Sequence, residues 1–468
     1  MDLLGSFGDI GLSLGFTILA FLFVLTIIVF IHEMGHFLAA RWCGVAVSTF
    51  SVGFGPELAG FTDRKGTRWK ISAIPLGGYV KFLGDENEAS ATDQAAIAAM
   101  SPEERSRAFA AKSVGARAFI VAAGPAANFI LAIAIFTLML LLSGRSVVAP
   151  RIDFVAPEGP AAVAGLQPGD VVLAVDGRSV TGFAEVERLV GLSPGRALTF
   201  TVDRNGTIVE VVATPDVQPA PGGMAGTIGD LGIGGPAMPP VVQQVQPGSP
   251  ADLAGVRPGD VIRSIAGEPV DDFDDIRGIV GPRAGEALPV VLERDGIEIR
   301  VTVTPEGTAV GGAPPVGRLG VVGGFADGDM QSVSFGPVTA FTEGVSETWF
   351  ITERTMTYLY RVIVGQESAD QLGGPLMVAK ISGDAARMGL AVLLNVAAVL
   401  SISIGIINLF PVPMLDGGHL LFFAIEAIRG RPLSERTQES GFRIGFVAVI
   451  ALMIFAFRND IINLKWLG

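Results

Sequence analysis

Two histidines and a glutamate stand close together near the N-terminus, at His32, Glu33 and His36. On a helix, side chains four positions apart lie on one face, so both imidazoles can bind one metal ion. The glutamate beside them is placed to take a proton from a water molecule on that ion. The chain has only three histidines, and two of them are in this motif. The spacing therefore predicts a metal site that activates water.

This motif follows directly on a long apolar segment. The run Ile10–Ile31 contains no charged residue, and about 20 apolar residues are enough to cross a bilayer. Ionisable side chains at membrane depth are costly and usually serve a function. Because the H-E-x-x-H pattern is typical of zinc peptidases, the first hypothesis is a metal-dependent hydrolase at a membrane.

The composition fits this setting. Hydrophobic residues make up 50% of the 468 residues and charged residues 17%, which favours membrane helices combined with soluble domains. The single cysteine, Cys43, excludes an intramolecular disulfide and a cysteine-rich zinc site. The N-terminus lacks the basic region of a cleavable signal peptide, so the first apolar run is expected to remain as a membrane helix.

Four segments are expected to cross the membrane. The first lies within residues 1–44, the second within 117–145 and the third within 387–428. The fourth, within 437–464, is weaker because only Ile444–Phe457 is free of charge. An arginine beside that stretch has to extend to the headgroups.

Charge placement predicts the orientation of these spans. Basic side chains are concentrated in the loop 45–116 and in the loop before the fourth span. Residues 150–330 instead hold 12 arginines, no lysine and 24 acidic residues, which is nearly all of the net charge of −13. Basic loops stay in the cytoplasm, so the acidic middle is expected on the outer side.

The acidic middle contains an internal repeat. The block Gly-x-x-Pro-Gly-Asp at 165–170 recurs at 255–260, and similar strand and helix patterns follow both copies. The period of 90 residues is too long for a solenoid and indicates two similar small domains. Both copies resemble the permuted PDZ domain of bacterial envelope proteases, over 150–216 and 230–306.

PDZ domains bind a peptide as an added strand and hold its carboxylate with backbone N–H groups of a glycine-bearing loop. A plain β-turn is the alternative interpretation of the two candidate loops. The peptide-groove candidates are Leu231, Gly232 and Ile233 in the first copy and Leu319, Gly320 and Val321 in the second. After the repeat, the aromatic residues of 330–386 suit an interfacial amphipathic helix or a packed helix that leads into the third span.

A catalytic zinc ion usually has three protein ligands and one water. Asp416 is the first ionisable residue after 28 uncharged positions, so it lies at a depth similar to that of His32. Pro411 and Pro413 break the helix before it. A carboxylate there needs a partner, and zinc held by two histidines is suitable, although an ordinary helix N-cap is the alternative. His419 is expected to support or pack against the site.

Taken together, these features resemble the site-2 protease family of intramembrane zinc metalloproteases, in the bacterial regulator of sigma-E protease type with tandem PDZ domains. The resemblance extends over nearly the whole chain. The stretches that carry it are His32–His36, Gly53–Gly55, Gly77–Val80, Gly124–Asn128, Gly373–Pro375 and Asn408–His419.

The resemblance implies a polytopic α-helical membrane protein with a membrane-reentrant β-hairpin and two extracytoplasmic α+β PDZ domains. It implies one Zn²⁺ ion bound by His32, His36 and Asp416. Glu33 would be the general base, and Asn408 would orient the substrate or stabilise the oxyanion. The implied substrate-binding candidates are Gly53, Gly55, Gly77, Gly78, Tyr79 and Asn128. Residues 45–82 fit the reentrant hairpin, although the glycines alone favour a simple cytoplasmic hairpin.

The implied partners are the lipid bilayer and single-pass membrane proteins trimmed by an upstream protease, such as anti-sigma factors and remnant signal peptides. Peptide C-termini are expected at the PDZ domains, and no nucleic acid is expected. The implied location is the bacterial inner membrane, with periplasmic PDZ domains and an active site towards the cytoplasm.

Two other hypotheses remain open on sequence alone. A membrane-anchored zincin acting on soluble proteins would take its third ligand soon after the motif, from Glu57 or Glu86. A non-catalytic PDZ scaffold would have no need for Glu33.

Overall fold

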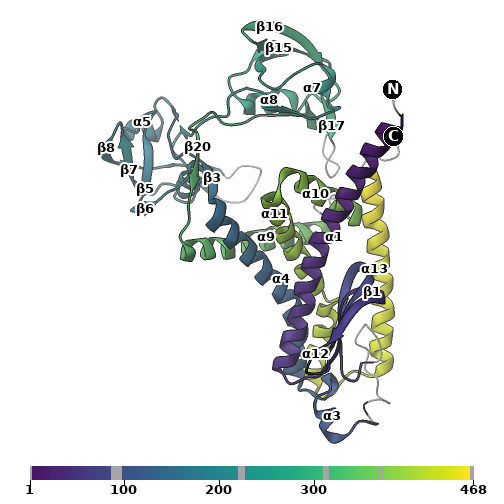
Figure 1. Cartoon of the computed structure of the whole chain (residues 1–468). Helices are drawn as coiled ribbons and strands as arrows, with labels where there is room; N and C mark the ends of the chain where they lie inside the picture. Colours follow the sequence, from purple (N-terminus) through teal and green to yellow (C-terminus); the bar gives the residue numbers. More distant parts are fainter. Residues whose placement is uncertain are drawn as a thin grey trace. The chain divides into compact units, whose positions relative to one another are not determined.

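The computed structural model divides the chain into two compact units (Figure 1). One unit combines Met1–Ser143 with Phe335–Gly468, and the other is Gly144–Ser334. The described residues are 3–85, 97, 99–219, 227–308, 316–365, 369 and 373–463.

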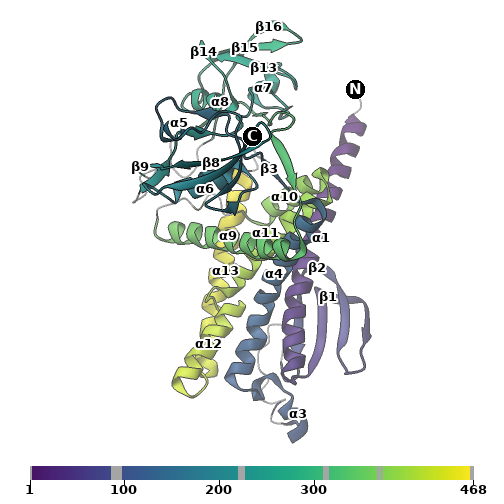
Figure 2. The ribbon, with the colours of Figure 1, turned by 90° about the vertical axis from the view of Figure 1, so that its left-hand side faces the viewer.

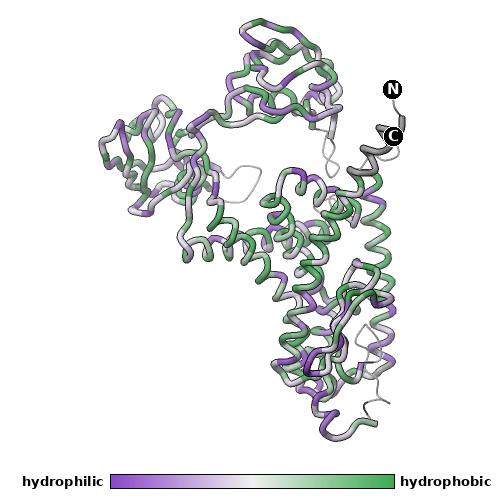
Figure 3. The backbone as a smooth tube through the Cα atoms, viewed as in Figure 1, coloured by the Kyte–Doolittle hydropathy of each residue, from purple (hydrophilic) through white to green (hydrophobic). Residues whose placement is uncertain are grey.

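Four helices of the first unit are long and apolar enough to cross a membrane, within the part of the chain that the structure describes. They are α1 (Leu3–Trp42), α4 (Val114–Ser143), α11 (Leu390–Leu409) and α13 (Glu435–Asn463). Hydrophobic residues follow one another along α4, α11 and α13 in Figure 3. The expectation of four candidate membrane spans is confirmed, and the protein is a polytopic membrane protein.

The helix that carries the H-E-x-x-H motif packs directly against α4 (Figure 2). A Cβ at Gly35 would lie 2.8 Å from the carbonyl carbon of Ala123, so only glycine permits this approach. Small residues at such crossings are typical of membrane helices. Further along, α4 and α11 share a buried cluster with α1 that includes Val24, Ile28 and Ile402. The contact holds the histidine-bearing face of α1 against α4.

A non-helical break of six residues separates α11 from α12 (Asp416–Arg429). Pro411 and Pro413 lie in this break, as expected of residues that lack a backbone donor and clash with the preceding turn. Met414 has φ = 96°, a strained value for a residue with a side chain. The break ends at Asp416, which therefore starts a new helix.

Long-range polar contacts anchor this region. Arg117 of α4 pairs with Glu426 of α12 at 2.6 Å, and both side chains are largely buried. The buried carboxylate of Asp460, on α13, accepts hydrogen bonds from the backbone N–H groups of Gly374 and Leu376 at 2.7 and 2.9 Å. These N–H groups begin α10 (Pro375–Met388), so a distant side chain caps that helix.

The helices α9, α3 and η1 also belong to this unit. The helix α9 (Pro337–Ile363) packs on α4 and exposes Phe341, Trp349 and Tyr360, which fits an amphipathic helix in the predicted region. The short helices α3 (Pro102–Ser106) and η1 (Phe109–Ala111) precede α4.

An antiparallel β-layer lies beside α1 and is built from β1 (Val47–Thr62) and β2 (Arg68–Phe82). Residues 49–52 pair on one side with 78–81 and on the other with 68–71, so both strands fold back on themselves. Gly53 and Gly77 are at the bends, with φ values of 91° and 148° that favour glycine. The expected hairpin is therefore a folded layer with 78–82 at an edge, and its entry into the membrane stays a prediction.

The second unit contains two similar subdomains. The sheet order is β6-β5-β7-β8 in the first and β14-β13-β15-β16 in the second, and each sheet has one longer helix, α6 or α8. Elements of the first are β4 (Phe154–Val155), α5 (Pro160–Ala164), β5 (Val171–Val175), β6 (Arg178–Ser179), α6 (Phe183–Gly191), β7 (Leu198–Arg204), β8 (Thr207–Ala213), β9 (Asp216–Pro219), β10 (Thr227–Asp230) and β11 (Ile233–Gly234). Those of the second are β12 (Gln244–Val245), α7 (Pro250–Leu253), β13 (Val261–Ile265), β14 (Glu268–Pro269), α8 (Phe273–Val280), β15 (Leu288–Arg294), β16 (Ile297–Val303), β17 (Glu306–Thr308), β18 (Val316–Arg318) and β19 (Val321–Val322). The strands β3 (Arg145–Val148) and β20 (Met330–Val333) pair with each other.

The repeated Pro-Gly-Asp turn ends in a buried ion pair. Asp170 accepts two hydrogen bonds from Arg204, both at 2.7 Å, and the same guanidinium donates to the carbonyl oxygen of Gly165. In the second copy, Asp260 accepts from Arg294 at 2.6 and 2.8 Å. The turn and the sheet of each subdomain are thus joined by one bidentate contact.

These pairs predict that acid weakens the second unit. Burial raises the pKa of Asp170 and Asp260, but the hydrogen bonds from Arg204 and Arg294 outweigh burial and hold each pKa below its usual value. The stabilising free energy of these ion pairs is fully present above about pH 4, which is the pKa of an aspartate in the unfolded chain. It is lost as the pH falls through the lower pKa of the folded state. We expect to see this loss when the full chain is unfolded with urea and the unfolding is monitored by hydrogen exchange of the backbone amides in residues 144–334.

The matched variant for this prediction is Asp170→Asn. It should cost about 2 kcal/mol of unfolding free energy at pH 7 and flatten the acid dependence of the first subdomain. An unchanged pH profile in this variant would show that other carboxylates cause the acid sensitivity.

Candidate metal centre

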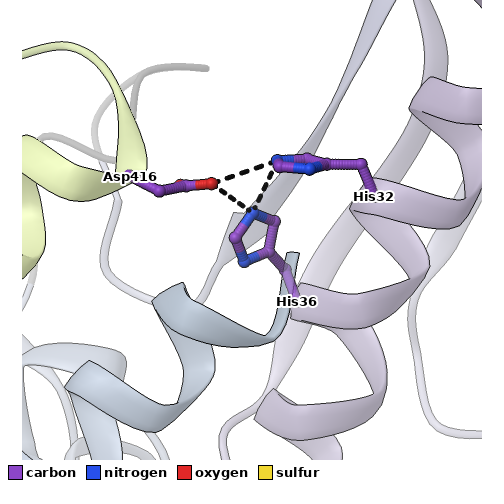
Figure 4. Close-up of side chains that lie close together, drawn as sticks. All are labelled: His32, His36 and Asp416. Atoms are coloured by element: carbon purple, nitrogen blue, oxygen red, sulfur yellow. Dashed lines mark hydrogen bonds and ion pairs between the residues drawn. The ribbon is translucent and has the colours of Figure 1, made fainter. Parts of the chain in front are cut away.

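The two histidines of α1 and the first residue of α12 come together at one point (Figure 4). The Nε2 atoms of His32 and His36 lie 3.2 Å apart. Asp416 Oδ2 lies 3.1 Å from the first and 3.4 Å from the second. Both histidines are buried. The structure therefore brings together residues some 380 positions apart, as the sequence predicted.

The donor atoms fit a bound cation. His36 Nδ1 lies 2.9 Å from the carbonyl oxygen of Ile120, so it donates there and leaves its Nε2 lone pair facing the other two groups. Asp416 Oδ2 is buried and accepts no well-formed hydrogen bond from a described residue. Two imidazole lone pairs and a carboxylate that face one another need a positive charge between them. Two nitrogens and one oxygen are a typical ligand set for zinc, with a fourth position for water.

Asn128 orients His32 rather than facing open space. Its side chain is fully buried, and its Nδ2 lies 3.3 Å from His32 Nδ1 while its Oδ1 has no hydrogen-bond partner among the described residues. A histidine that binds metal through Nε2 carries its proton on Nδ1 and needs an acceptor there. Turning the amide by 180° supplies that acceptor. This burial favours a supporting role over the predicted contact with substrate.

Glu33 faces a cavity next to the three ligands. Its carboxylate accepts a hydrogen bond from the backbone N–H of Val80, at the edge of the β-layer. The cavity has a volume of about 230 Å³. Its lining residues are His32, Glu33, His36, Gly78, Tyr79, Val80, Phe82, Phe109, Val121, Asn408, Met414, Asp416 and His419. Gly78, Tyr79 and Asn408 of the predicted site are therefore beside the metal ligands.

Other predicted residues lie elsewhere. Gly53, Gly55 and Gly77 are not among the residues that line this cavity, and they shape the bends of the β-layer instead. His419 lines the cavity and contacts the rings of Phe423 and Phe442, which matches the packing role expected for it.

The alternative third ligands are not supported. Glu57 forms an ion pair with Arg68 and is absent from the cluster of candidate ligands found among the described residues. Glu86 lies outside the described residues.

The peptide-groove candidates are only partly accessible. Leu231 and Leu319 place their side chains in the cores of their own subdomains, and the peptide-groove assignment of these loops stays a prediction. Ile233 pairs with Val155, and the equivalent Val321 pairs with Val245. The intervening Gly232 and Gly320 have φ values of 67° and 79°, as a turn requires.

Gly124 of α4 is a site residue for which the sequence predicted no role of its own. A Cβ there would lie 2.9 Å from His32 Nε2 and closer still to the ring of His36. The helix therefore has to present a glycine where the two imidazoles meet. The signal in the sequence was the Gly-Pro pair inside an apolar segment. Glycine and proline are unfavourable inside a helix, so their presence there indicates a requirement of packing or function.

Gly124→Ala should displace both imidazoles and lower zinc affinity about 10- to 100-fold, the usual cost of disturbing the surroundings of a metal ligand. Zinc retention against a chelator series measures this. The matched control is Gly115→Ala on the same helix, where a Cβ would have no neighbour within 4 Å. Equal affinities of the two variants would contradict the role given to Gly124.

Known proteins are similar to this chain over most of its length. The model of "Peptidase family M50" matches residues 20–452. A putative zinc metalloprotease of Rhizobium meliloti is 38% identical over 97% of this chain and 98% of its own. One of Brucella suis is 40% identical over 97% of both chains. The "Regulator of sigma-E protease RseP" of Salmonella typhimurium is 37% identical over 96% of this chain and 99% of its own.

The family match, the relatives and the ligand cluster agree with one another. The extent of the match includes both metal-binding segments and all of the second unit. The chain therefore belongs to peptidase family M50, the site-2 proteases, and is a zinc metalloendopeptidase with a multi-pass membrane fold.

Proposed function

We propose that this chain cleaves the transmembrane segments of single-pass membrane proteins that another protease has already shortened. The observation that carries this proposal is that the ligands come from a candidate membrane helix and from a break after a second one. Relatives named as regulators of sigma-E protease support anti-sigma factors as one substrate class, and remnant signal peptides are the other. The charge distribution supports the inner membrane, with the active site towards the cytoplasm.

Bound zinc would supply Lewis-acid polarisation of the scissile carbonyl and would acidify a water molecule. Glu33 takes the proton from the attacking water and returns it to the leaving amine. The Val80 N–H holds the Glu33 carboxylate at the cavity wall. Asn408, which also lines the cavity, would donate to the developing oxyanion.

A membrane helix hides its amides, so it has to unwind before cleavage. The cavity is lined by Gly78, Tyr79, Val80 and Phe82 from the edge of β2, and Gly78 leaves room beside Glu33. An extended substrate segment can add to this edge as a further strand. We therefore propose that the predicted hairpin enters the membrane from the cytoplasmic side and holds the unwound substrate segment at its edge.

We propose that the two repeats of the second unit are PDZ domains that screen substrates on the outer side. They would admit only segments whose bulky outer domain has been removed. The acidic charge of 150–330 and the insertion of the unit between α4 and α9 support this assignment.

Deleting residues 150–306 should allow cleavage of an intact substrate that the full chain leaves uncut. Immunoblots of intact and pre-trimmed substrate, co-expressed with either form of the chain, measure this. If the deletion stops cleavage of both substrates, the screening role is wrong.

The main test is cleavage of a model single-pass protein by the full chain in liposomes, with the cut mapped by mass spectrometry. We expect the cut inside the apolar segment and its loss on zinc chelation. Cleavage confined to soluble regions, or equal cleavage of unfolded casein, would instead favour a membrane-anchored protease of soluble substrates.

A further inference from the structure

A second cavity of the membrane unit lies at the end of α1, and its walls are basic. It has a volume of about 340 Å³ and is lined by Arg41, Lys65 and Arg107 among others. Lys112 is close by, because its Nζ lies 3.5 Å from the position of a Cβ on the lining residue Gly44. These four cations come from separate stretches of the chain. The fold therefore gathers positive charge at one place.

The acidic residue that contacts this cluster is already engaged. Asp63 forms an ion pair with Arg41. Its carboxylate also accepts hydrogen bonds from the backbone N–H groups of Lys65 and Thr67, at 2.8 and 3.0 Å. The side chains of Lys65 and Arg107 have no hydrogen bond or ion pair within the part of the chain that the structure describes. Uncompensated positive charge around a cavity attracts an anion.

The cavity is expected at the depth of the lipid headgroups. The candidate span Leu14–Trp42 ends beside it. Trp42 is 83% exposed and packs edge-on against the ring of Phe119, at 5.8 Å between centroids. Exposed aromatic side chains at the end of a membrane helix mark the interface. A phosphate group at this level is available from every anionic phospholipid.

We propose that this cavity binds the phosphate group of an anionic phospholipid. The guanidinium of Arg107 can form a bidentate hydrogen-bonded contact with phosphate oxygens, and Lys65 and Lys112 add positive point charges. The cavity shares no lining residue with the metal centre, so the site is separate from catalysis. A bound lipid would join the turn between β1 and β2 to the segment before α4 and to the end of α1.

The test compares the unmodified full chain with three variants, each in nanodiscs of phosphatidylcholine that contain one fifth phosphatidylglycerol. Lipids retained by the detergent-released protein are counted by native mass spectrometry. The variants are Lys65→Gln, Arg107→Gln and, as matched control, Arg64→Gln, which removes the same charge from the same turn but does not line the cavity. Each lining variant should lower phosphatidylglycerol retention about fivefold, and the control should lower it little. Unchanged zinc content verifies that each variant is folded.

A second arm separates the sources of phosphate. Inorganic phosphate is added to the chain in neutral detergent and its binding is followed by calorimetry. Weak phosphate binding together with strong lipid retention supports the proposal. Tight phosphate binding without any preference for phosphatidylglycerol would overturn the lipid assignment. Equal losses in Lys65→Gln and Arg64→Gln would also overturn it, because net charge alone would then explain retention.

Discussion

Asp416→Asn is expected to lower the zinc affinity of the chain by more than about 100-fold. Asp416 supplies the only negative charge in the ligand cluster found among the described residues. Disturbing a residue behind a ligand already costs 10- to 100-fold, so removing the charge of a ligand should cost more. Zinc per chain, measured by mass spectrometry after equilibration with chelators of graded affinity, gives the result directly.

Two controls make this test specific. Asp384→Asn changes an exposed carboxylate of α10 that pairs with Lys380, and it should retain zinc like the unmodified chain. Glu57→Gln should do the same, because Glu57 pairs with Arg68 instead of a histidine. If Asp416→Asn keeps zinc, or if Glu57→Gln loses it, the assignment of the third ligand is wrong.

Glu33→Gln is expected to retain zinc and to lower turnover of a model membrane substrate by about 10²- to 10⁴-fold. That range is the usual contribution of a general acid–base group. Glutamine keeps the size of the side chain and can still accept the hydrogen bond from Val80 N–H, so the cavity should keep its shape. Single-turnover cleavage rates with saturating enzyme measure the effect on chemistry.

The zinc content of the same preparation separates the explanations for Glu33→Gln. Loss of zinc together with activity would make Glu33 a ligand or a structural residue. Full turnover with full zinc would show that Glu33 is not the general base.

The break around the strained residue Met414 shows which features can be predicted from local sequence and which cannot. The two prolines before it predict a helix break, and the break is there. Its direction, which turns Asp416 back towards α1, depends on packing that the prolines do not encode. Similarly, the glycines of 45–82 predict turns, but the pairing of 49–52 with both 68–71 and 78–81 is fixed across the layer.

The sequence by itself determined the H-E-x-x-H spacing, the four apolar spans, the break before Asp416 and the repeated turn of the second unit. All of these are local patterns with the period of a helix, a strand or a bilayer crossing. Only the tertiary structure decided that Gly124 makes room for the imidazoles, that Asn128 supports His32, and that scattered basic residues share one cavity. These contacts join positions far apart in the chain. They arise from close packing between elements, which leaves no repeating pattern in the sequence from which it could be predicted.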